Sequence, residues 1–378
     1  MKYLKYKKPL DLLLKEAAET GEGTLRRTLG AGSLIALGIG AIIGAGLFVR
    51  TAAAAAEHSG PAVTLAFILA AVGCGLAGLC YAEFASMIPI AGSAYTYSYA
   101  TMGEVVAWVI GWDLVLEYAV GAATVSIAWS EYLNKLLENV GMHIPYEFCH
   151  SPFQSSLDGV QGIINLPALF IVIVLSLVLI RGTKESATVN GVIVVLKVAI
   201  VIAFIAIGWG FINPANHVPY IPENVTGKFG DFGWSGVVSA AGVVFFAFIG
   251  FDAVSTAAQE AKNPKKDMPI GILVSLAICT VLYVLFGHVL TGVASYKEFA
   301  TAGKEASVAY TIETYMQNYH WLSVLVTVAI LAGFSSVILV MLLGQSRVFY
   351  SMSKDGLVPK VFSTIHPKFK TPYKSNLI

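Results

Sequence analysis

The sequence predicts an all-α protein that crosses a membrane several times, and three observations support this fold class. Hydrophobic residues make up 56% of the 378 residues and charged residues only 12%, so a water-soluble globule is a poor fit. The apolar residues fall in long runs, each near the roughly 20 residues that a helix needs to cross hydrocarbon. The lysines and arginines lie between these runs and gather on alternate sides.

We expect eight membrane-spanning helices, because a helix satisfies its own backbone polar groups, as lipid requires. The predicted spans are Ala31–Ala53, Pro61–Phe84, Glu104–Ser130, Ile163–Arg181, Asn190–Phe211, Gly233–Ser255, Pro269–Thr291 and Trp321–Gly344. A polar segment without a small-residue cleavage site precedes the first span. We therefore predict no signal peptide and a cytoplasmic N-terminus.

The distribution of basic residues supports this orientation. With the N-terminus inside, the outer loops hold only Arg50, Lys135, Lys228, Lys297 and Lys304, and most other lysines and arginines lie in inner segments. This asymmetry fits the positive-inside rule, although the net charge of the chain is only +1. We predict an integral protein of the cell membrane.

The first span carries a run of glycines in its middle. The segment Gly38–Gly46 contains four glycines, each of which costs a helix about 1 kcal/mol relative to alanine. Close helix packing through Gly40 and Gly44 is one interpretation. The other is a broken helix near Ile42–Gly46, whose new N-terminus offers unpaired N–H groups to a carboxylate.

The sixth span carries the matching feature, Phe245–Asp252, in which a glycine follows an aromatic cluster. Ordinary core packing explains the aromatics alone. However, five spans separate the two glycine-interrupted segments, so they lie in halves of opposite orientation, which is typical of a transporter binding site. Carbonyl groups freed at this second break would accept an ammonium group, and Phe246 is large enough to cover the ligand.

These segments belong to an ordered series that resembles the amino acid–polyamine–organocation superfamily, and within it the cationic amino acid transporter branch and its bacterial relatives. The matching segments are Arg26–Leu29, Gly38–Val49, Gly60-Pro61-Ala62, Tyr81-Ala82-Glu83, Pro89–Tyr95, Gly103-Glu104, Gly111-Trp112, Glu117-Tyr118, Phe248–Asp252, Glu260–Pro264, Arg347–Pro359 and His366–Pro372. So many matches in order are more specific than one glycine motif.

The resemblance implies a LeuT-type fold, in which two groups of five helices form inverted repeats and the unwound first and sixth helices hold the substrate. The chain then divides into an N-terminal cytoplasmic segment 1–30, a first repeat 31–211, an outer loop 212–232, the start of a second repeat 233–345 and a cytoplasmic loop 346–378. The superfamily has further helices. We therefore expect the chain to be a fragment that stops before a ninth span.

Lys197 lies within the fifth predicted span, and the segment Val194–Ile200 around it contains no acidic residue. A lysine in hydrocarbon is costly and usually serves a function. It is either a structural lysine held by backbone carbonyls or a titrating amine that replaces a coupling cation. The resemblance favours the second, since some proton-coupled members have a lysine here. It implies that Lys197 bridges the chain near Gly40 and either Ser335 or Ser336.

The expected substrate site combines both breaks with residues of two other spans. Glu117 and Asp252 are acids within spans, with roles in binding, proton relay or structure, and Met341 faces the substrate side chain by resemblance, where it shortens the pocket. The residues expected to contact substrate are Ile42, Ile43, Gly44, Ala45, Gly46, Glu117, Phe246, Ala247, Ile249, Asp252 and Met341.

The predicted function is secondary active transport of amino acids, by proton-coupled symport of small neutral ones, with cationic substrates as a second option. The alternatives are a sodium-coupled or exchange carrier, and a sensor of the same fold that binds amino acids without moving them. We find no motif of an enzyme, metal site or cofactor, and no signal of nucleic-acid binding. The expected partners are the amino acid, a proton and membrane lipid, and a small single-pass membrane subunit is a further option.

Overall fold

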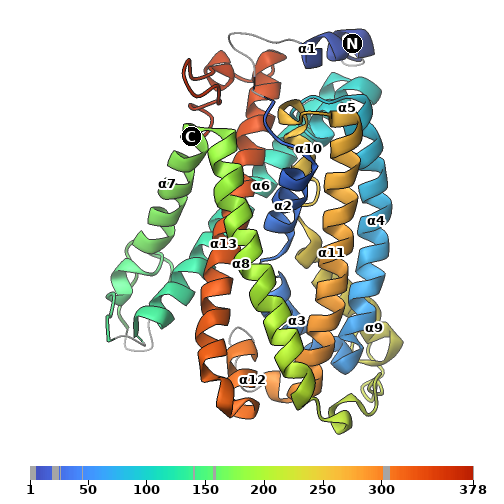
Figure 1. Ribbon diagram of the computed structural model, residues 1–378, viewed down its shortest axis with the longest axis vertical. Coiled ribbons are helices and arrows are strands. Elements are labelled where there is room, and N and C mark those ends of the chain that lie inside the picture. The colour runs from blue at the N-terminus through green and yellow to red at the C-terminus, as the bar shows by residue number, and fades with distance from the viewer. Residues whose placement is uncertain are drawn as a thin grey trace.

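The computed structural model describes residues 6–18, 25, 27–44, 46–138, 141–155, 159–300 and 307–377. Within these ranges the regular structure is helical, which confirms the predicted all-α class. Figure 1 shows the long helices side by side in one bundle, with α1 lying across its upper end and the last residues of the chain at that same end.

The helices differ widely in length. Their bounds are α1 Leu10–Ala18, α2 Ala31–Ile42, α3 Thr51–Ala54, α4 Val63–Met87, α5 Ala94–Thr101, α6 Glu104–Glu138, α7 Leu166–Arg181, α8 Thr183–Gly208, α9 Gly233–Phe245, α10 Ala253–Thr256, α11 Pro264–Val293, α12 Ser307–Tyr315 and α13 His320–Lys354. Short single turns of tighter or wider helix connect several of them.

Six helical runs among the described residues are long and apolar enough to cross a membrane: Gly46–Met87, Glu104–Glu138, Ser186–Phe211, Gly233–Thr256, Pro264–Val293 and Trp321–Lys354. Two shorter apolar helices, α2 and α7, occupy parts of the first and fourth predicted spans. The run Gly46–Met87 changes direction at Gly60, whose φ of +58° favours glycine. The second half of the predicted first span and the predicted second span therefore belong to one helical run, which bends at Gly60.

Local sequence explains where several helices begin and end. The helix α11 begins at Pro264, and the backbone N–H of Asn263 donates to the Asp267 carboxylate at 3.0 Å, as in a helix N-terminal cap. The helix α13 ends before Gly356, whose φ of +79° suits the glycine that commonly follows a helix. The predicted eighth span stopped at Gly344, but α13 continues for ten further residues, to Lys354.

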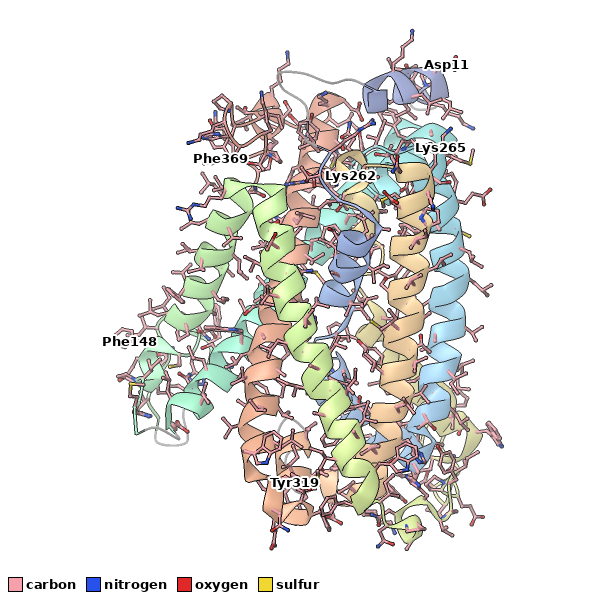
Figure 2. The ribbon with its side chains drawn as sticks, viewed as in Figure 1. Asp11, Phe148, Lys262, Lys265, Tyr319 and Phe369 are labelled. Atoms are coloured by element: carbon pink, nitrogen blue, oxygen red, sulfur yellow. The ribbon has the colours of Figure 1, made fainter. Side chains whose placement is uncertain are left out.

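The extension of α13 is possible because its arginine is paired. Arg347 Nη2 donates to Glu260 Oε1 at 2.6 Å, and both side chains are fully buried. Glu260 also accepts backbone hydrogen bonds from the N–H groups of Thr28 and Leu29, both at 2.9 Å through its carbonyl oxygen. At the upper end of the bundle, the segments next to α2 and α10 are therefore tied to each other and to α13. Lys262 and Lys265 lie at this end and Tyr319 toward the other (Figure 2).

The first break lies between α2 and α3. Ile43 is extended, with φ −76° and ψ 101°, and helical structure resumes at Gly46. Two close approaches require glycine here. A Cβ on Gly46 would lie 2.2 Å from the Ala247 Cα, and a Cβ on Gly44 would lie 2.7 Å from a Val337 methyl group. The glycines of this segment therefore let other helices reach its backbone.

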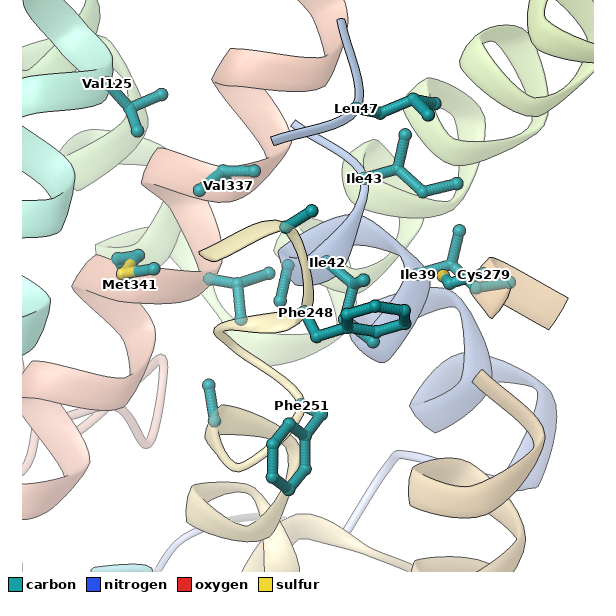
Figure 3. Packing of buried hydrophobic residues seen from close by; sticks show 14 of the residues in the cluster. Ile39, Ile42, Ile43, Leu47, Val125, Phe248, Phe251, Cys279, Val337 and Met341 are labelled. Atoms are coloured by element: carbon teal, nitrogen blue, oxygen red, sulfur yellow. The ribbon is translucent and has the colours of Figure 1, made fainter. Parts of the chain in front are cut away.

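The second break lies between α9 and α10. After one tight turn at Phe246–Phe248, Ile249 is extended, with φ −55° and ψ 138°. Gly250 follows with φ +106°, and a Cβ on it would lie 2.9 Å from the Ala41 Cβ. The two breaks therefore lie against each other in the middle of the bundle, and Figure 3 shows Ile42 beside Phe248 there.

Candidate functional site

A cavity of about 440 Å³ lies where the two breaks meet α6 and α13. This volume is within the range of roughly 300–1,000 Å³ that is usual for small-molecule sites. The lining residues are Ala41, Ile42, Gly44, Gly46, Asp113, Leu116, Glu117, Val120, Gly121, Thr124, Val125, Phe246, Ile249, Val337 and Met341. The wall is apolar except for two acids and one threonine.

Seven of the predicted substrate-site residues line this cavity, from four separate stretches of the chain. They are Ile42, Gly44, Gly46, Glu117, Phe246, Ile249 and Met341. Ala45 lies outside the described residues. The glycine patterns in two distant spans thus identified segments that the fold brings to one place.

Three other predicted residues lie beside the cavity and are absent from its described lining. Ile43 is fully buried and Ala247 is 1% exposed, and each turns its carbonyl oxygen to a side chain of another helix. Asp252 is also buried, and its Oδ2 accepts a hydrogen bond of 2.6 Å from the Tyr118 hydroxyl on α6. The geometry gives these three residues supporting positions around the cavity.

Backbone groups supply most of the polar character near the breaks. The first N–H groups of a helix have no partner within that helix, and the helical run after the first break begins at Gly46 on the cavity wall. The extended residue Ile249 leaves its neighbouring carbonyls outside regular helix at the second break. A zwitterion needs this combination, because N–H groups bind a carboxylate and carbonyl oxygens bind an ammonium group.

Tyr283 of α11 joins the two breaks, and no sequence pattern predicts this role. Its hydroxyl lies 2.7 Å from the carbonyl oxygen of Ile42 and 2.8 Å from that of Ala247. The side chain is fully buried. A phenol has one proton to donate, so the two carbonyls share it. A tyrosine in an apolar helix is common, and only the fold shows that this one touches both breaks.

Lys197 of α8 is fully buried against the first break. Its Nζ donates to the carbonyl oxygens of Gly40 at 3.0 Å and Ile43 at 2.8 Å, and to the Ser336 hydroxyl at 2.7 Å. Three acceptors are what an ammonium group with three protons can use. Ser335 turns away and donates to Leu331 in its own helix. The contacts suit a charged lysine at the position where α2, α8 and α13 meet.

Phe246 separates the cavity from a second one of about 320 Å³. Both cavities include Phe246, Thr124 and Val125 in their walls, and the second one extends to Arg50. The Arg50 guanidinium lies 5.8 Å from the centre of the Phe246 ring, in the range of a cation–π contact.

Met341 of α13 packs directly against Gly121 of α6 on the cavity wall. A Cβ on Gly121 would lie 2.9 Å from the Met341 sulfur, so the two helices meet at this pair and the cavity ends there. Asp113 and Glu117 lie on the wall further along the same face of α6. Met341 and Glu117 are among the predicted site residues and Gly121 is not, since a single glycine in a long helix carries no specific signal.

Comparison with known proteins identifies one family over nearly the whole chain. The family model described as amino acid permease matches residues 29–378. The branched-chain amino acid permease BcaP of Bacillus subtilis is 46% identical over 94% of this chain and 73% of its own length. The methylthioribose transporter of the same organism is 42% identical over 98% of this chain and 76% of its own length.

The similarity extends to eukaryotic transporters. Cationic amino acid transporter 4 of Homo sapiens is 34% identical over 95% of this chain. The chain covers 54% of the length of that relative. These relatives are named as transporters of different substrates, so the similarity supports a transporter more strongly than any one substrate.

Proposed function

Since the chain belongs to the amino acid permease family, we propose that it carries neutral amino acids across the cell membrane by alternating access, in symport with protons. The cavity between the two broken helices is the observation that carries this proposal. The family and the apolar helices make the chain an integral membrane protein. The proposal adds a substrate class, a site and a coupling ion.

The proposed binding mode follows from the two breaks. The carboxylate of the amino acid lies at the N–H groups near Gly44 and Gly46, and its ammonium group lies at the carbonyls around Phe246 and Ile249. Phe246 closes the site on the side of the second cavity. The side chain points toward Met341. This mode is supported by the position of these residues on one cavity wall.

The proposed architecture is the LeuT-type inverted repeat. It has eight spans in this chain, with α2 and α3 as the two halves of the first and with α9 and α10 as the two halves of the sixth. The two breaks occur at the first and sixth positions and lie against each other, which supports this arrangement. The upper end of Figure 1 is then cytoplasmic, because α1, Lys262 and Lys265 lie there.

The proposed coupling group is Lys197. Its ammonium group, held by two carbonyls of the first break and by Ser336, fills a position that would suit a bound cation. Loss of the proton removes a charge from these carbonyls and loosens α2 from α8 and α13. The proton and the substrate therefore act on the same segment of the chain.

The substrate class is proposed from the cavity wall. Leu116, Val120, Val125, Val337 and Met341 give an apolar surface for a neutral side chain. Met341, packed against Gly121, limits the length of the cavity and favours a short side chain, such as that of alanine. The name of the Bacillus relative suggests branched side chains as the next class to test. A cationic side chain would instead approach Asp113 or Glu117.

The test is uptake into proteoliposomes of radiolabelled alanine, leucine, arginine and methylthioribose, with proton and sodium gradients imposed separately. We expect alanine or leucine to accumulate with an inward proton gradient and without sodium. Binding of these amino acids without uptake would support the sensor of the same fold and contradict transport. Uptake that needs sodium and is indifferent to pH would contradict the proposed coupling.

A further inference from the structure

A second polar residue of α8 contacts α2, two helical turns from Lys197. Asn190 and Lys197 are seven residues apart and therefore share one face of the helix. Both are almost fully buried, with exposed fractions of 1% and 0%. Buried amides in an apolar helix are uncommon and need a hydrogen-bond partner. Asn190 lies nearer than Lys197 to the start of α8, and this helix starts at the upper end of the bundle in Figure 1.

The amide of Asn190 holds the backbone of α2. Its Nδ2 donates to the carbonyl oxygen of Ala36 at 2.9 Å. Its Oδ1 accepts no hydrogen bond from the described part of the chain. A buried acceptor without a donor is costly, so an aliphatic side chain would be the better choice for packing alone. The bond to Ala36 is the interaction that an aliphatic residue would lose.

Asn190 also explains why residue 40 carries no side chain. A Cβ on Gly40 would lie 2.4 Å from Asn190 Oδ1 and 2.7 Å from its Nδ2. The carbonyl oxygen of the same Gly40 accepts from Lys197 at 3.0 Å and from Ser336 at 2.8 Å. The last turns of α2 are thus held at two levels, by a neutral amide at Ala36 and by an ammonium group at Gly40.

We propose that Asn190 is a positioning residue that fixes α2 on α8 independently of the charge on Lys197. The inference rests on the proposed proton coupling, in which Lys197 loses its charge during the cycle. When that charge is lost, the Asn190–Ala36 bond keeps α2 attached, so the end of α2 at the break moves while the Ala36 level serves as the pivot. The hydrogen-bond partners of Lys197, on α2 and α13, are uncharged, and among the described residues the titratable group that interacts with it is the thiol of Cys279 on α11.

The first test is a pair of rescue experiments on uptake per folded molecule, with folded protein counted by size-exclusion chromatography. We expect Gly40→Ala to lower uptake roughly tenfold or more, because the new methyl group displaces Asn190 and shifts the break. Asn190→Ala alone should retain more uptake than Gly40→Ala. The double variant should recover to the level of Asn190→Ala, since the colliding atoms are gone.

The matched control is Gly44→Ala. A Cβ there would lie 2.7 Å from a Val337 methyl group, and Asn190 is not among the atoms that it meets. Asn190→Ala should therefore not rescue Gly44→Ala. Equal rescue of both glycine variants, or no rescue of Gly40→Ala, would overturn the proposal.

The second test separates positioning from simple packing. The substitution Ser33→Cys on α2 reports the exposure of this helix to an impermeant maleimide. At alkaline pH we expect several-fold faster labelling with Asn190→Ala than with Asn190 in place, and little difference at acidic pH, where Lys197 holds α2. If the proteins with and without Asn190→Ala were labelled equally fast at both pH values, the proposal would be overturned.

The variant Lys197→Gln tests the proposed proton coupling separately. If that variant keeps the wild-type pH profile of uptake, the proton coupling by Lys197 fails. Rescue of Gly40→Ala by Asn190→Ala would then still support the contact between Asn190 and α2 as a determinant of transport. The two proposals can therefore fail independently.

Discussion

Removal of the Tyr283 hydroxyl should destabilise the arrangement in which the two breaks lie against each other. In Tyr283→Phe, the carbonyl oxygens of Ile42 and Ala247 lose the hydroxyl group that now lies 2.7 and 2.8 Å from them. The lost hydrogen bond contributes about 1 kcal/mol, and a buried carbonyl left without a donor costs roughly 1–3 kcal/mol. Ile42 lines the cavity, so water in the cavity would offset part of this cost. We expect a net loss of about 2 kcal/mol.

Two measurements check this value. The apparent melting temperature of the purified protein should fall by about 2–4 °C, given the size dependence of melting shifts. If the closed, substrate-bound arrangement bears the whole loss, the affinity for substrate should fall by up to roughly 30-fold, since 1.4 kcal/mol corresponds to a factor of ten. Equilibrium binding of radiolabelled substrate measures the second quantity, without dependence on the transport cycle.

Tyr97→Phe is the matched control, because it removes a buried tyrosine hydroxyl that has no hydrogen-bond partner among the described residues. Loss of an unpaired polar group should leave stability unchanged or raise it slightly. If Tyr283→Phe behaved like Tyr97→Phe in both assays, the bridge between the breaks would have no energetic role. The reasoning on the backbone carbonyls of the site would then be wrong.

Three further predictions concern the breaks and the upper end of the bundle. Lys197→Gln should remove the dependence of uptake on the proton gradient while leaving folding intact, as measured by uptake across a series of imposed pH differences. Gly46→Ala should abolish uptake, since its Cβ would lie 2.2 Å from the Cα of Ala247 and backbone cannot rotate away as a side chain can. Arg347→Ala should lower stability by about 3–5 kcal/mol in thermal unfolding, because it leaves the fully buried Glu260 carboxylate without this partner.

Matched variants separate these effects from general damage. Lys228→Gln removes an exposed lysine of the predicted outer loop and should keep the wild-type response to pH. Gly73→Ala places a methyl group where nothing lies within 4 Å, so uptake should persist. Glu260→Gln combined with Arg347→Met removes both charges of the buried pair and should be less destabilising than Arg347→Ala alone. Loss of uptake in Gly73→Ala would show that a glycine substitution is harmful regardless of local contacts.

The sequence was sufficient to find the two breaks because their cause is local. Clustered glycines weaken a helix wherever they occur, and the close approaches at Gly44, Gly46 and Gly250 are the contacts that a side chain would prevent. Lys197 was found for a similar reason, since a buried charge is conspicuous in an apolar segment. Its predicted connection with the first break matches the contacts with Gly40 and Ile43.

Other parts of the site could not be predicted, because they depend on the rotation of one helix against another. Tyr283 and Asn190 belong to helices whose sequence shows only a polar residue in an apolar run. The position of Asp252 depends on the chain path after Gly250, where φ is +106°, and that path directs the carboxylate to Tyr118. The continuation of α13 past the predicted eighth span could not be foreseen, because the partner of Arg347 is 87 residues away in sequence.

The contacts of the first break explain how two ligands would influence each other. Lys197 binds the carbonyl oxygens of Gly40 and Ile43, Tyr283 binds that of Ile42, and Gly44 lines the cavity. The four residues of the break lie within the stretch from Gly40 to Gly44, so a movement of one changes the geometry of the others. In the proposed mechanism, a substrate bound at Gly44 therefore alters the affinity of Lys197 for its proton, and by linkage the proton alters substrate affinity by the same factor. Coupling then needs no direct contact between substrate and Lys197, because the backbone of five residues connects them.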